Sequence, residues 1–280
     1  MLTERTWEGG EVPLNVAGAP TGAPPLLLLH AVGRRWRSFD PILPALLPAW
    51  QVLALDLRGH GRSGRADSYF VPDYVRDVAA FLRDNTPEPA VVYGHALGAL
   101  VALALAAELP DRVRAIVLED PPTLAPATLR AMPMHALWTE AQRLAGPGRS
   151  VAEVTRHLAE SRVYVGGARV QVGQARDRLF LRFAARCLAD LDPAALDPFL
   201  EGGWLGGFDP TAAAESVTCP VLLLRGDETQ GGLMSKEDAD QLAARLADCE
   251  RVDFPETGNL IHWLQTQTLL HHLLGFLGSL

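Results

Sequence analysis

Short apolar runs alternate with longer helical patterns along most of this chain, and that alternation limits its fold more than any other feature. Continuous apolar runs bounded by Gly, Pro or Asp are typical of strands buried on both faces of a parallel sheet. The alternation therefore predicts an α/β fold with right-handed crossovers and a doubly wound, mostly parallel sheet. Strands are expected at 26–29, 52–55, 90–93, 113–118, 221–224 and 249–254, and helices at about 38–47, 73–85, 97–108, 235–247 and 262–277.

Two stretches depart from this rhythm. Residues 6–16 predict an antiparallel hairpin at the sheet edge, with Gly9 and Gly10 in its turn. From 121 to 216 we expect only helical segments, at 132–144, 151–161, 174–188 and 193–200. The sequence thus predicts a core domain of residues 1–120 and 217–280, with a helical lid (cap) of residues 121–216 inserted after the sixth strand. Ligands bind at this edge of open α/β sheets.

Composition excludes several classes of protein. The 280 residues carry a formal charge of −8 and no basic stripe, which argues against nucleic acid as a partner. No apolar run is long enough for a membrane span, and the polar start lacks a signal core. Cys187, Cys219 and Cys249 show neither a disulfide framework nor metal-ligand spacing. We expect a cytoplasmic protein that acts on a small molecule without a metal or cofactor. A nucleotide-binding fold is disfavoured because no glycine-rich phosphate loop is present.

The segment 94–98, Gly-His-Ala-Leu-Gly, follows an expected strand and opens an expected helix. This is the context of the G-x-S-x-G turn that presents a nucleophile above a sheet. Its two glycines permit a sharp turn and the close approach of neighbouring backbone.

With three further motifs, the chain resembles the α/β-hydrolase superfamily over essentially its whole length. The motifs are His-Ala-Val-Gly at 30–33 in place of H-G-x-G, 56–63 close to D-x-R-G-x-G-x-S, and 257–262 in place of G-H-x-x-H. The resemblance is to the lid-bearing branch of esterases, lactonases, C–C hydrolases and epoxide-hydrolase-like enzymes. It implies the α/β-hydrolase fold and hydrolysis without a cofactor.

The resemblance also assigns positions for the reaction. Ala96 occupies the nucleophile position and Asn259 the base position, and neither side chain suits the role, because a methyl group cannot attack and an amide is not basic. Asp120 is favoured as the acid, with Asp227 as the alternative. The backbone N–H groups of Val32 and Leu97 would form the oxyanion hole.

Other residues carry open alternatives. His262 is either a displaced base or a structural hydrogen-bonding residue at a helix start. Arg34, Arg35 and Trp36 either face an acid group of the substrate or lie in a solvated loop. Met132, Met134, His135 and Trp138 either line the pocket or pack the lid against the sheet. The residues expected to bind substrate are His30, Ala31, Arg34, Trp36, His95, Met134 and Trp138.

Two functions remain open from the sequence. One is a silenced serine hydrolase of small, mostly apolar esters or lactones, inactive or strongly impaired because of Ala96 and Asn259, whether engineered or natural. The other is a naturally diverged member that binds a ligand or acts as a lyase, cyclase or isomerase in the same cavity. That second function would rely on Asp120, His262 and the oxyanion N–H pair.

Overall fold

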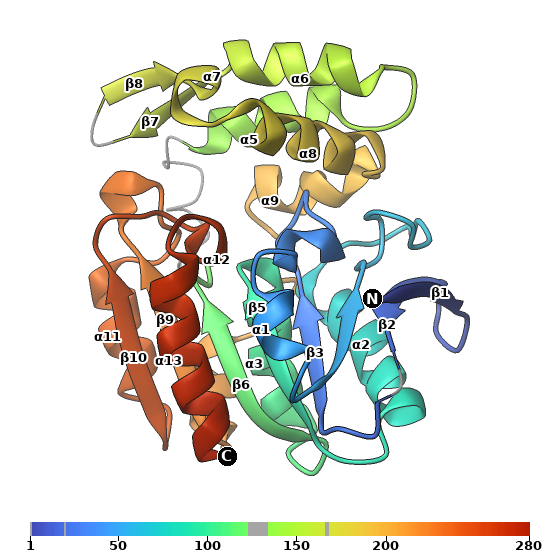
Figure 1. Cartoon of the computed structure of the whole chain (residues 1–280), viewed down its shortest axis with the longest axis vertical. Coiled ribbons are helices and arrows are strands. Elements are labelled where there is room, and N and C mark those ends of the chain that lie inside the picture. The colour runs from blue at the N-terminus through green and yellow to red at the C-terminus, as the bar shows by residue number, and fades with distance from the viewer. Residues whose placement is uncertain (1, 20, 123–133, 166–167) are drawn as a thin grey trace.

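A computed structural model describes residues 2–19, 21–122, 134–165 and 168–280, and it contains a twisted eight-stranded sheet (Figure 1). The strand order is β1-β2-β4-β3-β5-β6-β9-β10, and every neighbouring pair from β4 to β10 is parallel. The strands are β1 (Thr3–Trp7), β2 (Leu14–Gly18), β3 (Pro25–Leu29), β4 (Gln51–Leu55), β5 (Ala90–His95), β6 (Val113–Glu119), β9 (Val221–Gly226) and β10 (Cys249–Phe254). The mostly parallel sheet expected from the apolar runs is confirmed, with β1 and β2 as its antiparallel edge.

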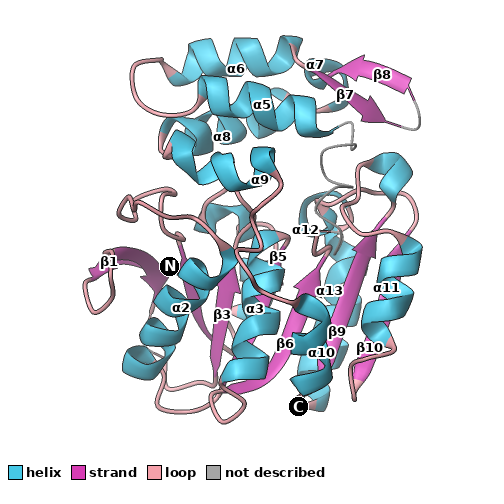
Figure 2. Cartoon of the chain, turned by 180° about the vertical axis from the view of Figure 1, so that it is seen from behind, coloured by secondary structure: helices cyan, strands magenta, loops and turns pink. Residues whose placement is uncertain are grey.

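Successive side chains of each buried strand point to opposite faces of the sheet, where they pack in two separate hydrophobic clusters. In β3, Leu27 and Leu29 belong to one hydrophobic cluster, and Leu26 and Leu28 belong to the other. Helices α2 (Val71–Asn85), α3 (Leu97–Glu108), α10 (Pro210–Ser216) and α11 (Lys236–Ala243) cover the first face (Figure 2), and α1 (Leu43–Leu46), α12 (Ile261–Leu264) and α13 (Thr266–Ser279) cover the second. Burial on both faces explains why these strands are apolar throughout.

Three expected helices are interrupted. The stretch 174–188 is divided between a helix of residues 172–175 and one of residues 178–189. The stretch 38–47 forms a 3-10 turn, η1 (Trp36–Phe39), and the short α1, because Pro41 and Pro44 each lack the N–H that a continuous helix needs. The stretch 262–277 is divided into α12 and α13 at Gln265, whose backbone is not helical.

A helical layer, residues 134–201, lies across the end of the sheet at which β5, β6 and β9 finish (Figures 1 and 2). It contains α5 (Met134–Leu144), α6 (Val151–Glu160), α7 (Val172–Ala175), α8 (Arg178–Ala189), η2 (Pro193–Leu196) and α9 (Asp197–Glu201). The expectation of helices alone in this region is wrong, because β7 (Arg162–Val165) and β8 (Ala168–Gln171) form an antiparallel hairpin. Four-residue strands are too short to leave a clear period in the sequence. Another 3-10 turn, η3 (Glu228–Gln230), follows β9.

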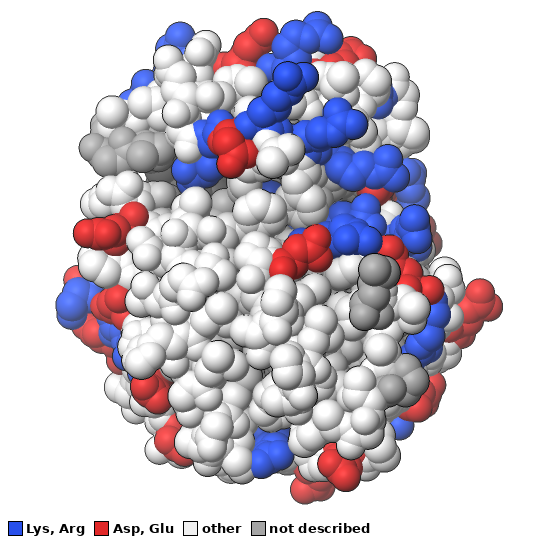
Figure 3. Space-filling model, viewed as in Figure 1, with Lys and Arg blue, Asp and Glu red and all other residues white. Residues whose placement is uncertain are grey.

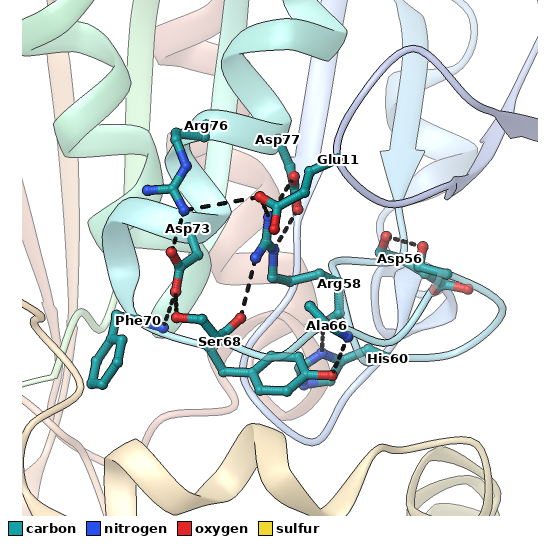
Figure 4. Close-up of polar contacts among 12 residues, drawn as sticks. Glu11, Asp56, Arg58, His60, Ala66, Ser68, Phe70, Asp73, Arg76 and Asp77 are labelled. Carbon is teal, nitrogen blue, oxygen red and sulfur yellow. Dashed lines mark hydrogen bonds and ion pairs between the residues drawn. The ribbon is translucent and has the colours of Figure 1, made fainter.

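The loop after β4 is held by a buried arginine (Figure 4). The Arg58 guanidinium donates to both carboxylate oxygens of Asp77, each over 2.7 Å, and to Glu11 over 3.1 Å. Asp56 in the same loop accepts the backbone N–H groups of Trp36 and Arg62. The motif at 56–63 is therefore a structural anchor between the sheet and α2. Among the described residues, no helix is long and apolar enough to cross a bilayer.

Candidate active site

The turn between β5 and α3 has the geometry expected of a nucleophile elbow. Ala96 has φ 49° and ψ −108°, a conformation in which a residue with a side chain is strained by about 1–3 kcal/mol. A Cβ at Gly94 would collide with the backbone of Gly98, and one at Gly98 would collide with the backbone carbonyl of Leu29. Both glycines are therefore required by close packing of the turn against α3 and β3.

Ala96 faces a cavity of about 200 Å³ between the sheet end and the helical layer. The cavity brings together seven residues that the sequence places at the site, namely Ala31, Val32, Arg34, His95, Ala96, Trp138 and Asn259. Apolar side chains of the helical layer, such as Leu137, Phe180 and Leu181, complete its wall. Such a lining suits a small ligand with an apolar body.

The expected oxyanion donors come from two neighbouring turns. Val32 lines the cavity, and Leu97 directly follows Ala96 as the first residue of α3. Within the described parts of the chain, neither backbone N–H has a hydrogen-bond acceptor. The first turn is fixed by the N–H of Gly33, which donates to His60 Nε2 over 3.0 Å, and by that of Arg34, which donates to the carbonyl of Ala31 over 3.1 Å.

Both candidate acids accept backbone N–H groups around the end of β9. Asp120 directly follows β6 with φ 45°, is fully buried, and accepts the N–H groups of Gly226 (3.1 Å) and Leu233 (2.8 Å). Burial raises the pKa of Asp120 to about 7, against the lowering effect of these donors. Asp227 caps η3, where its Oδ1 accepts the N–H and the hydroxyl of Thr229. Neither carboxylate contacts the Asn259 side chain in the described structure.

A third carboxylate, that of Glu119, hydrogen-bonds to His262. Glu119 is fully buried and accepts the backbone N–H of His262 (3.0 Å), its ring Nδ1–H (2.7 and 2.8 Å to the two oxygens) and the Tyr93 hydroxyl (2.7 Å). Burial raises the pKa of this carboxyl, but the imidazoles of His262 and His95 outweigh burial and lower it to about 2. In this pair His262 makes structural hydrogen bonds, as one of its two expected roles requires, and its ring is not among the described residues that line the cavity.

The sequence motifs do not single out Glu119, which directly precedes Asp120 in the chain. Glu119 is the last residue of β6, and its carboxylate faces Tyr93 and the start of α12. Asp120 leaves the strand with φ 45°, and its carboxylate faces the backbone at and after the end of β9. The end of β6 therefore directs the two neighbouring carboxylates to different partners.

His95 connects the cavity with this buried pair. Its Nε2–H donates to the backbone carbonyl of Asn259 over 2.6 Å, and its ring lies 4.8 Å from that of His262, centroid to centroid. Burial lowers the pKa of His95 to about 4, so the ring is neutral at pH 7. The second nitrogens, Nδ1 of His95 and Nε2 of His262, are buried and have no hydrogen-bond partner in the described parts of the chain. Ligand atoms of His95, Glu119 and His262 lie within 4.8 Å of one another, but the carboxylate oxygens already accept hydrogen bonds.

Comparison with known proteins supports the α/β-hydrolase fold. A model of the α/β hydrolase fold family matches residues 24–150. Over nearly the whole chain, the structure resembles that of E-2-(acetamidomethylene)succinate hydrolase, with a TM-score of 0.82, 22% identity and coverage of 99% of this chain and 100% of that one. The chain has the α/β-hydrolase fold.

Two curated relatives extend the likeness. The 2-(acetamidomethylene)succinate hydrolase of Mesorhizobium japonicum is 34% identical over 112 residues, which cover 40% of this chain and 40% of that protein. The 3-hydroxybutyrate-oligomer hydrolase of Cupriavidus necator is 26% identical over 261 residues, covering 86% of this chain and 84% of that protein. The first alignment spans less than half of its relative.

Two described residues expected to bind substrate, His30 and Trp36, are not among the cavity-lining residues. His30 is fully buried, and its Nε2 accepts the Leu57 N–H over 3.0 Å. Trp36 is 3% exposed and packs in the core beneath η1, so it neither faces a substrate nor lies in a solvated loop. Both serve the packing of the loops around the site. The side chain of Met134 lies outside the described residues.

Proposed function

We propose that this chain is a serine-hydrolase scaffold for small, mostly apolar esters or lactones that is inactive or strongly impaired as it stands. The observation that carries the proposal is that Ala96 and Asn259 line one cavity, at the two positions where the superfamily places its nucleophile and base. A methyl group cannot form an acyl intermediate, and an amide cannot accept a proton near neutral pH.

The remaining parts support an acyl-transfer ancestry. The strained elbow and its glycines are retained, and the Val32 and Leu97 N–H groups lack internal acceptors among the described residues. Backbone donors survive side-chain substitution, so a carbonyl oxygen of a bound ligand can still be polarised. The helical layer acts as the lid over this cavity. The relatives are named hydrolases, which agrees with this ancestry.

Asp120 remains our choice of acid for a restored triad. Two N–H donors occupy only part of the acceptor capacity of its carboxylate, which has about four lone-pair sites. A histidine at position 259 would therefore find an acceptor there without displacing either donor. Asp227 is the weaker choice because its Oδ1 already accepts twice within its own turn.

The deciding experiment restores the two groups with Ala96→Ser and Asn259→His, separately and together. Each protein is assayed on short p-nitrophenyl esters and on lactones. The unaltered chain and both single variants should stay near the background rate, because triad members act as a unit. The double variant should exceed them by about 10²-fold or more. Rapid ester turnover by the unaltered chain would refute the proposal.

The second candidate is a non-hydrolytic enzyme (a lyase, cyclase or isomerase) or a ligand-binding protein in the same cavity. The observation that favours it is the neutral His95 at the cavity wall, next to His262 and Glu119, since this cluster uses neither the Ala96 nor the Asn259 side chain. A correctly folded double variant without hydrolysis would favour this candidate. Native mass spectrometry of the purified chain would then show whether a ligand is retained.

A further inference from the structure

Two guanidinium groups line a cavity whose other described lining residues are mostly apolar and include no Asp, Glu or Lys. Arg34 comes from the turn after β3, and Arg176 follows α7 in the helical layer. Both side chains are half-buried, and both lie against the ring of Phe180, with 5.1 Å and 5.8 Å from the guanidinium carbon to the ring centroid. Their convergence on one ring brings two positive charges from distant parts of the sequence to one wall of the cavity.

Neither arginine has an acidic partner among the described residues. Adjacent Arg35, by contrast, pairs with Asp190 over 3.2 Å. Arg176 donates only to the backbone carbonyl of Ala175, over 2.9 Å, and the Arg34 side chain donates to no described residue. A guanidinium carries five N–H donors, so most of the donors of this pair are unused.

The surroundings make this unpaired arrangement unfavourable without a ligand. Among the described residues that line the cavity there is no Asp or Glu, and the only other ionisable side chain is that of His95. Burial lowers the pKa of Arg34; Cys187 acts in the opposite direction, and the smaller effect of the Arg176 charge also lowers this pKa. Two like charges held near each other in a poorly solvated place repel until an anion is shared between them.

The outer surface also favours the approach of an anion. Although the whole chain carries −8, basic side chains gather over the helical layer on the face shown in Figure 3. Helix α8 contributes Arg178, Arg182 and Arg186 at one-turn spacing. A local positive field raises the encounter rate with small anions.

We propose that Arg34 and Arg176 together bind the carboxylate of the ligand, with the Phe180 ring supporting both guanidinium planes. The ligand class is thus a small carboxylic acid whose apolar chain carries a second carbonyl group, such as a half-ester or a lactone acid. Planar carboxylates suit the forked donors of arginine. The position of the second carbonyl at Ala96 rests on the proposed function, but the carboxylate subsite itself does not.

Binding is tested on the unaltered chain, which needs no turnover. Isothermal titration compares monomethyl adipate with dimethyl adipate, which differ in one charge and keep the same chain. The monoester should bind at least about tenfold more tightly. Equal binding of the two esters, or no binding of the monoester, would overturn the proposal. Inorganic phosphate is the third probe, and tighter binding of phosphate than of the monoester would refute the choice of carboxylate.

Arg34→Met and Arg176→Met should each weaken monoester binding about tenfold or more and leave binding of the diester unchanged. Arg178→Met, which removes an exposed arginine outside the cavity lining, is the matched control and should bind as the unaltered chain does. Thermal unfolding verifies that each variant is folded. If an arginine variant fails to fold, Arg34→Lys and Arg176→Lys replace it, since they keep the charge, and a loss of binding is expected because the fork is missing. Unchanged binding in folded methionine variants contradicts the subsite.

The outcomes separate this proposal from the previous one. If the unaltered chain prefers the monoester and the double variant hydrolyses nothing, the carboxylate subsite is supported and the serine-hydrolase scaffold is refuted. If the double variant hydrolyses esters but the chain shows no preference for the monoester, the scaffold is supported and the carboxylate subsite is refuted.

Discussion

Replacing Glu119 with Gln tests whether the buried Glu119–His262 pair is maintained by charge. One oxygen of the new amide can still accept the N–H and Nδ1–H of His262, so the shape of the site is kept. The amide nitrogen would replace the oxygen that accepts the Tyr93 hydroxyl, which must then rotate. The main loss is therefore the negative charge between the imidazoles and the hydroxyl.

The magnitude follows from the pKa of Glu119. The native value of about 2 lies below the ordinary 4.5, so the folded state binds fewer protons than the unfolded state between these values. Stability from this group is complete above pH 4.5 and decreases as the pH falls through 4.5 toward 2. At about 1.4 kcal/mol per pH unit, the contribution is about 3 kcal/mol at pH 7 and about 2 kcal/mol at pH 3.5.

Urea unfolding followed by tryptophan fluorescence at these two pH values measures the effect. The variant should lose about 3 kcal/mol at pH 7, and its deficit should narrow at pH 3.5. Tyr93→Phe is the matched control, because it removes one hydrogen bond and keeps the charge, and it should lose about 1 kcal/mol at both pH values. A Glu119→Gln deficit that does not change with pH would refute the electrostatic reasoning.

Two more predictions concern the elbow and the acid beside it. Gly98→Ala should lower the unfolding free energy by about 3 kcal/mol, because the new methyl group meets the backbone of β3; Gly275→Ala, in open space on α13, should raise it by about 0.5–1 kcal/mol in the same urea titration. Asp120, whose pKa is raised from 3.8 to about 7, stabilises the fold below pH 3.8 and loses that contribution as the pH rises to 7. Asp120→Asn should be less stable than the parent at pH 4, and the difference in unfolding free energy should shift by about 3 kcal/mol in favour of the variant by pH 7; a difference that is independent of pH would show that Asp120 does not titrate in this range.

Local patterns were sufficient for the sheet and for the elbow. The apolar runs predict β3, β4, β5, β6 and β9 because burial on both faces leaves no polar position in a strand. The glycines at 94 and 98 predict a sharp turn around Ala96, and the structure shows φ 49° there. The hairpin β7–β8 could not be predicted, because its short strands are stabilised by pairing with each other and by packing on the helical layer.

The sequence by itself determined that the side chains for nucleophilic attack and for proton transfer are missing at the two family positions. Side-chain chemistry at Ala96 and Asn259 is a property of the residue types, and their family positions follow from motifs a few residues long. Only the tertiary structure decided which neighbours face the cavity. Arg34 lines it and Arg35 pairs with Asp190, while Glu119 rather than Asp120 holds His262. These choices depend on contacts between residues more than 100 positions apart, and such contacts are set by how the elements pack, which no local period encodes.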